Sequence, residues 1–232
     1  MIQITRQLLV DFYQLVKRYR QTYLIIVAAA TLTGLFTARF DAEALVKIRI
    51  PNNPNWDQIA AAISDWGEPQ ISVLPPCLFL IAIGFYTKKV RYRRIGMACI
   101  LSVLIAGALV NILRPTLGRP RPYTELPDKL YFFKLDHRYH GTPSGHMTAS
   151  TAAAACLGVA LPLTSPAVVL YAGSVGWSRM QLRRHHPTDI FLGCVLGCLV
   201  GIPFGYLGRQ GESAAPREEQ PASQPDPTDE TS

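Results

Sequence analysis

Arginine and histidine are concentrated in three short segments of the 232-residue sequence, and all 5 histidines lie between positions 137 and 186. The segments are Arg114-Pro-Thr-Leu-Gly-Arg119-Pro-Arg121-Pro122, Pro143-Ser144-Gly145-His146, and the stretch from Ser178 and Arg179 through His185 to Asp189. A guanidinium group offers a planar fork of donors that matches phosphate oxygens, and it stays charged at any physiological pH. Several arginines beside histidines, without a pair of carboxylates, therefore indicate binding of a phosphate group.

The second and third segments suit phosphoryl transfer. Ser144 and Gly145 precede an apolar run, so they are expected to begin a helix whose backbone N–H groups and dipole favour an anion. His185 and Asp189 are four residues apart. On one helix they would share a face, and the carboxylate would fix the tautomer of the imidazole and raise its basicity. An imidazole oriented in this way attacks phosphorus and forms a covalent phosphoryl-enzyme.

His146 then has a second role, as donor of a proton to the departing oxygen. The phosphate oxygens are expected to be held by three guanidinium groups and two backbone amides, those of Arg114, Arg121, Arg179, Ser144 and Gly145. A lone histidine at the edge of a loop is usually only solvated. Three coherent clusters at three successive helix ends disfavour that explanation here.

Metal-dependent hydrolysis requires a different set of side chains. Divalent cations such as Mg²⁺ prefer carboxylate ligands, and the loops that carry the three segments hold no Asp or Glu cluster at a suitable spacing. Two histidines are able to bind a metal, but the surrounding arginines would repel it. We therefore expect no metal and no cofactor.

The remaining sequence describes the elements that must position these residues. Apolar residues make up 49% of the chain and charged residues 17%, against about 25% charged residues in an ordinary domain. Apolar runs of roughly 17–20 residues, a length that spans a bilayer core, occur at 23–38, 71–87, 95–113, 147–163, 166–182 and 190–207. This pattern excludes a soluble enzyme, a coiled coil and a disordered regulator. It predicts an all-α, polytopic integral membrane protein with six transmembrane helices and the active site at the outer-face helix mouths.

The distribution of positive charge predicts the orientation. The formal net charge is +7, but the basic cluster at 88–94 lies between two apolar runs, as the positive-inside rule expects of a short cytoplasmic loop. We therefore expect no nucleic-acid partner. The chain divides into a cytoplasmic N-terminal segment (1–22), a six-span membrane domain (23–208) and a disordered cytoplasmic tail (209–232). The predicted location is the cell (inner) membrane, with the active site facing the periplasm or the cell exterior.

Two features of the predicted outer loops need an explanation. The loop 114–146 is basic, which the positive-inside rule disfavours, so its charge should have a function. The other feature is the segment 56–66, which has helical apolar spacing. It is either a helix on the membrane surface or a short packing helix.

The last apolar run carries a stripe of glycines at intervals of four, namely Gly193, Gly197, Gly201 and Gly205. Such a stripe lets another helix approach closely. That neighbour lies either in the same chain or in a second copy, so a homo-oligomer through this stripe is one of two options.

Together the three segments resemble the motifs of the type 2 phosphatidic acid phosphatase superfamily, which also includes vanadium haloperoxidases and bacterial acid phosphatases. The family pattern is Lys-x6-Arg-Pro, Pro-Ser-Gly-His and Ser-Arg-x5-His-x3-Asp. The second and third motifs are intact here, whereas Arg114 stands where the family usually has Lys. That replacement keeps the charge, but a guanidinium fork is not equivalent to an ammonium group.

The resemblance implies that His185 is the nucleophile, Asp189 its orienting partner and His146 the general acid. It implies phosphate binding by Arg114, Arg121, Arg179, Ser144 and Gly145, in a reaction that needs no metal. Six further residues fall outside these roles and either shape headgroup recognition or are only solvated: His137, His140, His186, Arg119, Arg183 and Arg184.

The implied function is that of a membrane lipid phosphatase, which hydrolyses a phosphomonoester or diphosphate of a lipid through a phosphohistidine. Candidate substrates by resemblance are undecaprenyl diphosphate, phosphatidylglycerol phosphate, phosphatidate and the phosphate of lipid A. A lipid phosphotransferase would use the same phosphohistidine with an acceptor alcohol in place of water. An anion transporter is disfavoured because the sequence has no internal repeat and its charges lie at helix mouths. The six apolar runs disfavour a haloperoxidase.

Overall fold

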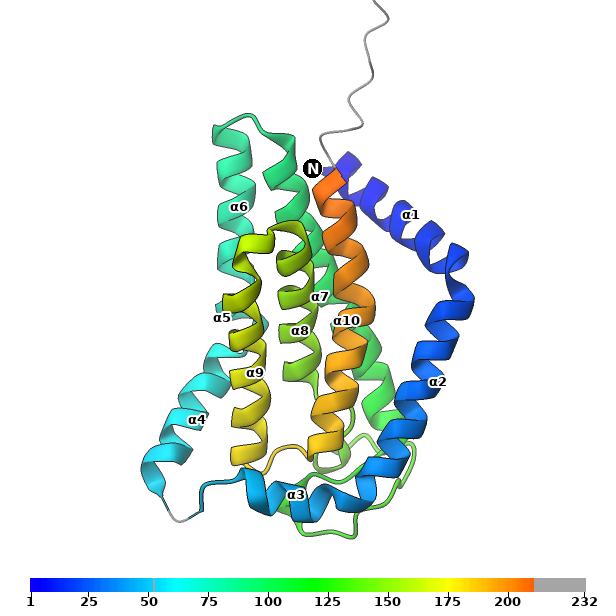
Figure 1. The fold of residues 1–232 in the computed structure, drawn as a ribbon, viewed down its shortest axis with the longest axis vertical. Helices are drawn as coiled ribbons and strands as arrows, with labels where there is room; N and C mark the ends of the chain where they lie inside the picture. The colour runs from blue at the N-terminus through cyan, green and yellow to red at the C-terminus, as the bar shows by residue number, and fades with distance from the viewer. Residues whose placement is uncertain (52, 211–232) are drawn as a thin grey trace, which may run out of the picture.

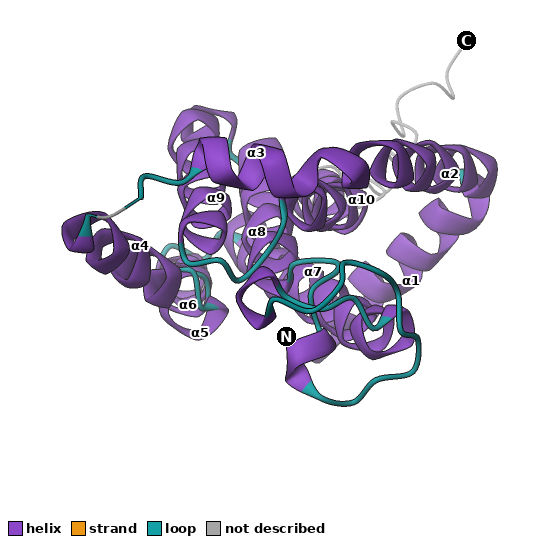
Figure 2. Ribbon diagram, turned by 90° about the horizontal axis from the view of Figure 1, so that it is seen from below, coloured by secondary structure: helices purple, strands orange, loops and turns teal. Residues whose placement is uncertain are grey.

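The computed structural model describes residues 1–51 and 53–210, and every regular element in these two ranges is helical (Figures 1 and 2). The α-helices are α1 (Ile2–Arg18), α2 (Arg20–Thr37), α3 (Asp41–Ile48), α4 (Pro54–Trp66), α5 (Pro69–Ser72), α6 (Leu74–Tyr86), α7 (Val90–Leu117), α8 (Gly145–Ala160), α9 (Ser165–Gln181) and α10 (Pro187–Arg209). Short 3₁₀ turns lie at Ala38–Phe40, Pro122–Thr124, His137–Tyr139 and Pro162–Thr164. The predicted all-α class is confirmed for the described chain. The tail predicted at 209–232 lies outside the described residues from position 211 onward.

The helix α8 forms the centre of the bundle and packs against α7, α9 and α10 (Figure 1). Most of its residues are Ala, Gly, Ser or Thr, and the greater part of the helix is buried. Small side chains allow neighbouring helices to approach closely on all sides. Because α10 packs closely along α8, the N-terminal ends of both helices lie next to each other at one end of the bundle (Figure 1).

The glycine stripe of α10 packs against α8 of the same chain. A Cβ atom at Gly193 would lie 2.8 Å from the carbonyl oxygen of Ser144, and one at Gly197 would lie 2.6 Å from the carbonyl oxygen of Thr148. Gly201 and Gly205 meet the α8 backbone in the same way. Of the two options, the structure adopts a neighbour within the same chain, because α8 occupies the stripe.

The helices have the composition of membrane spans. Within residues 1–51 and 53–210, four helical segments are long and apolar enough to cross a bilayer: Arg20–Ile48, Pro69–Tyr86, Val90–Thr124 and Pro187–Arg209. The large apolar side chains of α2 face outward, including Leu24, Ile25 and Leu32 with exposed fractions of 66%, 68% and 69%. Such a surface suits lipid rather than water. The helices α8 and α9, with 16 and 17 residues, are shorter than the other spans, so the count of six stays a prediction.

The two ends of the bundle carry different residues. The N-terminus and the turn between α6 and α7, which holds the basic cluster 88–94, lie at one end (Figure 1). The helix α3, the long segment 118–144 and the turn between α9 and α10 lie at the opposite end (Figures 1 and 2). All three arginine- and histidine-containing motifs therefore meet at a single end.

The end of α7 is fixed by Gly118, which has a φ of +63° and a backbone N–H bonded to the carbonyl of Arg114 at 2.9 Å. A glycine tolerates this left-handed conformation without steric cost. The chain then folds back on the last turn of α7, and its N–H groups bond the carbonyls there: Tyr131 to Gly118, Phe132 to Leu117, Phe133 to Thr116 and Lys134 to Pro115. These bonds hold an otherwise irregular segment of 27 residues (118–144) against the bundle.

The first loop predicted on the outer side forms α3, α4 and α5. The helix α4 includes the segment 56–66 and packs against α9, where the rings of Trp56 and Trp177 meet edge to face at 5.9 Å. The alternative of a packing helix is therefore the one that the structure adopts. As a result, the last turn of α4 and the corner before α5 lie beside the motif residues of α9.

Candidate active site

His185 is the centre of the candidate active site. Its side chain is 1% exposed, and its Nδ1 lies 2.7 Å from the carbonyl oxygen of Gly141. A carbonyl only accepts hydrogen bonds, so Nδ1 carries the proton and Nε2 carries the lone pair. This Nε2 is buried without a hydrogen-bond partner. A buried imidazole nitrogen with a free lone pair and no hydrogen-bond partner is a candidate nucleophile.

Asp189 is fully buried at the start of α10. One carboxylate oxygen accepts a hydrogen bond from the backbone N–H of His186 at 2.8 Å, and the other accepts from Arg119 at 2.7 Å. The helix begins at Pro187, after His185, so His185 and Asp189 do not share a helical face as the four-residue spacing predicted. The distance from His185 Nδ1 to the carboxylate is 3.7 Å. Asp189 acts on His185 as a nearby negative charge, and it also holds the turn in place by capping α10.

Arg119 connects three carboxylates. It is 5% exposed and donates to Asp189 at 2.7 Å, to Asp41 at 2.7 Å and to both oxygens of Asp128 at 2.7 and 2.6 Å. The alternative that Arg119 is only solvated is therefore wrong, because the side chain is buried and its donors are engaged by protein carboxylates. Asp41 belongs to α3 and also accepts from the N–H and hydroxyl of Thr188, both at 2.9 Å. The network attaches α3 to the first turn of α10.

The prediction that the outer loops hold no cluster of Asp or Glu residues is wrong in three dimensions. The tertiary structure brings Asp41 and Asp128 together with His186, and possible ligand atoms of the three lie within 4.8 Å of one another. The guanidinium of Arg119 already bonds both carboxylates. A metal ion at this position would have to displace the buried guanidinium of Arg119, which is bonded to three carboxylates. Asp41 and Asp128 therefore suit an arginine better than a metal.

The helix α8 follows the cap residue Ser144, whose hydroxyl oxygen accepts from the N–H of Met147 at 3.5 Å. The N–H of Ser144 donates to the carbonyl of Asp189 at 3.0 Å, so this amide is not free to bind phosphate as the sequence predicted. The first N–H groups of a helix have no partner within it, so the amides at Gly145 and His146 are available to an anion. Arg114 crosses this helix end and donates from Nε to the carbonyl of Pro143 at 3.0 Å. The predicted helix N-terminus and the first motif therefore lie together.

Gly145 leaves the space that the Arg114 guanidinium occupies. A Cβ atom at position 145 would lie 2.6 Å from Cζ of Arg114, so the Gly145→Ala variant must push this guanidinium away. We expect kcat/KM for a phosphate ester to fall about 10- to 100-fold, the value of one lost charged hydrogen bond. Gly173→Ala is the matched control, because a Cβ there meets nothing within 4 Å. Equal activities of the two variants would contradict a phosphate role for Arg114.

His146 contacts an acidic residue that the sequence does not single out. Its Nε2 lies 2.9 Å from Oε1 of Glu68, at the corner between α4 and α5. A carboxylate only accepts, so Nε2 of His146 carries a proton that is directed at Glu68. The imidazole of His146 thus presents a proton, whereas that of His185 presents a lone pair. No motif or spacing in the sequence connects Glu68 with His146.

Arg179 and Arg121 lie around the same two histidines. Arg179 is 8% exposed and donates to the hydroxyl of Ser64 in α4, while its carbonyl accepts from the N–H of His185 at 3.3 Å. The charges of Arg179, Arg114 and Arg121 all act on the ring of His146, and those of Arg121 and Arg179 act on His185. The structure therefore brings together all the residues that the three motifs predicted, although their roles are not tested by this placement.

Burial lowers the pKa of His185 from 6.5 to about 3, and the charges of Arg121 and Arg179 act in the same direction against the opposing effect of Asp189. A lowered pKa keeps the imidazole neutral as the pH falls, so its lone pair persists well below pH 6. We expect the His185 signal in histidine-selective ¹⁵N NMR, assigned from its loss in His185→Ala, to stay unchanged between pH 8 and pH 5. A titration midpoint near 6.5 would contradict this environment.

The other residues outside the motif roles have different surroundings. His186 is 7% exposed and caps α10, so it is not solvated. Arg183 donates to the carbonyl of Pro122 at 3.2 Å, and Arg184 is exposed above the ring of Tyr123. His137 is exposed, with His140 edge to face beside it. Of this group, Arg184 alone has a charge that reaches both Arg121 and Arg179.

Comparison with known families agrees with this geometry. The model of the PAP2 superfamily matches residues 95–210, which is half of the chain and includes all three motifs. The chain belongs to the PAP2 superfamily. The family assignment drawn from the motifs is thereby confirmed, and with it the class of phosphoric ester hydrolase.

Relatives in the PAP2 superfamily have names that describe lipid phosphate chemistry. A decaprenylphosphoryl-5-phosphoribose phosphatase from Mycobacterium tuberculosis is 27% identical over 74% of this chain and 92% of its own length. An undecaprenyl-diphosphatase from Sulfolobus acidocaldarius is 28% identical over 70% and 76%, respectively. A lipid A 1-phosphatase from Rhizobium johnstonii is 29% identical over 49% and 50%.

Two solved structures share the PAP2 fold. A PAP2 type phosphatidylglycerolphosphate phosphatase from Bacillus subtilis has a TM-score of 0.59 at 21% identity, with 86% of this chain and 97% of that chain covered. LpxE from Aquifex aeolicus has a TM-score of 0.53 at 24% identity, with 73% and 94% covered. At these identities the likeness establishes the fold, and the membrane-protein character of the chain agrees with it.

Proposed function

We propose that this PAP2 protein is a membrane lipid phosphatase that works through a phosphohistidine on His185. The observation that carries the proposal is the buried Nε2 of His185, which has no partner and lies within reach of the charges of Arg121 and Arg179. A neutral nucleophile beside several fixed positive charges suits attack on an anionic phosphorus centre. The names of the relatives describe the same class of reaction.

The first step transfers the phosphoryl group to the enzyme. Nε2 of His185 attacks phosphorus, the bond between phosphorus and the leaving oxygen breaks, and its electron pair stays on that oxygen. His146 acts here as the imidazolium, a form that the bound phosphate anion favours. It gives its Nε2 proton to the leaving oxygen and becomes a neutral imidazole. Arg114, Arg121 and Arg179, with the backbone amides of Gly145 and His146 at the start of α8, hold the three equatorial oxygens.

The second step releases phosphate. A water molecule attacks the phosphohistidine, and His146, now without its proton, accepts one from the water. The bond from Nε2 to phosphorus breaks, and its electron pair returns to Nε2 as the lone pair present at the start. The Nδ1–H bond to Gly141 holds the ring in one orientation through both steps, because the carbonyl accepts the same proton in each state.

An apolar cavity supports a lipid as the substrate. A cavity of about 550 Å³ lies between α2, α7 and α10, and its walls include Val27, Leu35, Leu192 and Leu196. It extends to Thr142 and Pro143, directly before the second motif. An acyl or prenyl chain in this cavity would place its phosphate near the N-terminus of α8.

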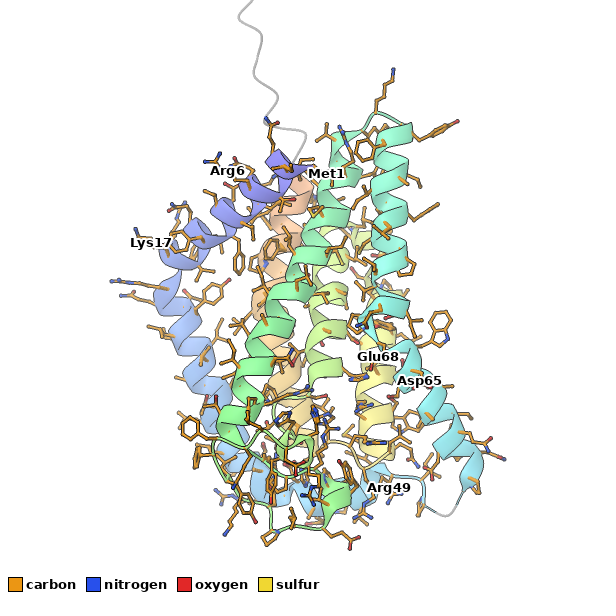
Figure 3. The ribbon with its side chains drawn as sticks, turned by 180° about the vertical axis from the view of Figure 1, so that it is seen from behind. Met1, Arg6, Lys17, Arg49, Asp65 and Glu68 are labelled. Carbon is orange, nitrogen blue, oxygen red and sulfur yellow. The ribbon has the colours of Figure 1, made fainter. Side chains whose placement is uncertain are left out.

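The charge distribution supports a site on the outer face, with both termini in the cytoplasm. Arg6 and Lys17 project from α1 at the end of the molecule away from the motifs (Figure 3), and the basic cluster 88–94 is at that end also. The positive-inside rule places this end in the cytoplasm. At the other end Arg119 and Arg179 are buried and Arg114 and Arg121 half-buried around the site, which gives part of the charge of this basic loop a function on the outer side.

The test is phosphate release by the detergent-purified protein from a panel of lipid phosphates, with EDTA present throughout. We expect release from at least one lipid, without a requirement for added metal. Failure to cleave every lipid, by a protein that remains folded, would contradict the phosphatase function. Labelled phosphate that moves to a second lipid, with no free phosphate, would identify a phosphotransferase instead.

A further inference from the structure

Glu68 has a fixed position at the mouth of the site. Its backbone carbonyl accepts from the N–H groups of Ile71 and Ser72 at 2.9 and 3.1 Å, and the hydroxyl of Ser72 bonds that of Tyr171 in α9 at 2.6 Å. The preceding Gly67 packs so closely on α9 that a Cβ atom there would lie 3.0 Å from Val175. The corner between α4 and α5 is therefore attached to α9, and the backbone of Glu68 is held beside the motif residues of that helix.

The side chain of Glu68 is 46% exposed, and its oxygen lies 2.9 Å from Nε2 of His146. Figure 3 shows Glu68 at this corner, with Asp65 one turn earlier on α4 and farther from the bundle. The proton on Nε2 is the one that a general acid would give to the leaving oxygen. That oxygen must therefore approach the place that the Glu68 carboxylate now occupies, and the carboxylate becomes a neighbour of the leaving group.

A carboxylate at this position distinguishes leaving groups by their charge. The negative charge of Glu68 already reaches Arg114 and Arg179, so it lies within the electrostatic range of the phosphate site. Cleavage of a lipid phosphomonoester releases a neutral alcohol. Attack on the terminal phosphorus of a lipid diphosphate releases a lipid phosphate, whose negative charge would lie beside Glu68. Like charges brought together in a partly buried site are disfavoured.

We propose that Glu68 is a specificity-determining residue that disfavours anionic leaving groups, so that lipid phosphomonoesters are preferred to lipid diphosphates. This inference depends on the proposed phosphatase function. It assigns a role to the first outer loop, which contains none of the family motifs. The interaction that carries it is the contact between Glu68 and His146.

The experiment compares a polyprenyl monophosphate with the diphosphate of the same chain length, so that only the leaving group differs. Initial rates are measured by chromatography of the lipid products, because the product of diphosphate cleavage is itself a monophosphate. The Glu68→Gln variant removes the charge but keeps an oxygen that accepts from His146. We expect its preference for the monophosphate, as the ratio of kcat/KM values, to fall on the order of tenfold from that of the wild type.

Two further variants distinguish an effect of the Glu68 charge on the leaving group from a general effect of charge at this end of the molecule. Asp65→Asn makes the same change of charge on an exposed residue of the preceding helix α4 and should leave the preference unchanged. Glu68→Asp keeps the charge and should retain most of the preference. An unchanged ratio in Glu68→Gln, or equal losses on both lipids, would overturn the selective role. If the wild type cleaves neither lipid nor any other in the panel, the proposed function fails first, and that result is distinct from a failure of selectivity.

Discussion

Replacement of His185 with alanine is expected to lower phosphate release at least about 10⁴-fold, because it removes the atom proposed to attack phosphorus. The variant should fold, since the side chain makes a single hydrogen bond, to Gly141. Rapid alkaline quenching of the wild type with ³²P-labelled substrate should trap a base-stable, acid-labile phosphoprotein. The variant should form none.

His137→Ala is the matched control, because His137 is an exposed histidine in the same end of the molecule. It should retain wild-type rates and form the same labelled intermediate. A His185→Ala protein that still becomes labelled would show that another residue is the nucleophile. A wild type that turns over without any labelled protein would favour direct attack by water.

Replacement of Arg119 with alanine is expected to have the largest effect on stability. It leaves Asp41 and Asp189, which are 2% and 0% exposed, without their cation. Loss of one partner from a buried ion pair typically costs about 3–5 kcal/mol. We expect a large drop in thermal stability in detergent, together with at least about a 100-fold loss of kcat, since the turn that carries His185 is positioned by Asp189.

Arg119→Lys keeps the charge but not the fork that reaches three carboxylates at once. This variant should fold and lose kcat with little change in KM, which distinguishes a positioning role from a contact with substrate. Asp128→Asn is the control within the network, because Asp128 is 37% exposed and its loss leaves Arg119 paired with two other carboxylates. A thermal midpoint of Arg119→Ala close to that of the wild type would contradict the buried network.

The chemistry of the site follows from short-range patterns in the sequence. Pro143-Ser144-Gly145-His146 begins a helix because Ser caps and the following residues propagate it, and His186-Pro187-x-Asp189 begins another for a related reason. The apolar runs place these starts at the ends of two apolar helices, α8 and α10. Residue type and local spacing are therefore sufficient to indicate a phosphate site at one end of an all-helical bundle.

The sequence also assigns the glycine stripe a packing role but does not identify its partner. Any helix with small side chains would fit Gly193 to Gly205, and only the packed bundle selects α8. The spacing of His185 and Asp189 predicted a shared helical face, but α10 begins two residues too late for that. The first residue of α10 is set by its capping residue His186. The spacing between His185 and Asp189 does not indicate where that helix begins.

The sequence by itself determined which side chains are the candidates for the chemistry, while the tertiary structure decided which groups hold them in place. Arg119 is 78 residues from Asp41 and 70 from Asp189, and His185 is 44 residues from the Gly141 carbonyl that fixes its tautomer. Glu68 meets His146 only because α4 packs on α9. Contacts of this kind depend on how the helices pack. An Arg, Asp or Glu in a loop is expected to be exposed, and no local sequence pattern identifies a partner that lies far away in the chain.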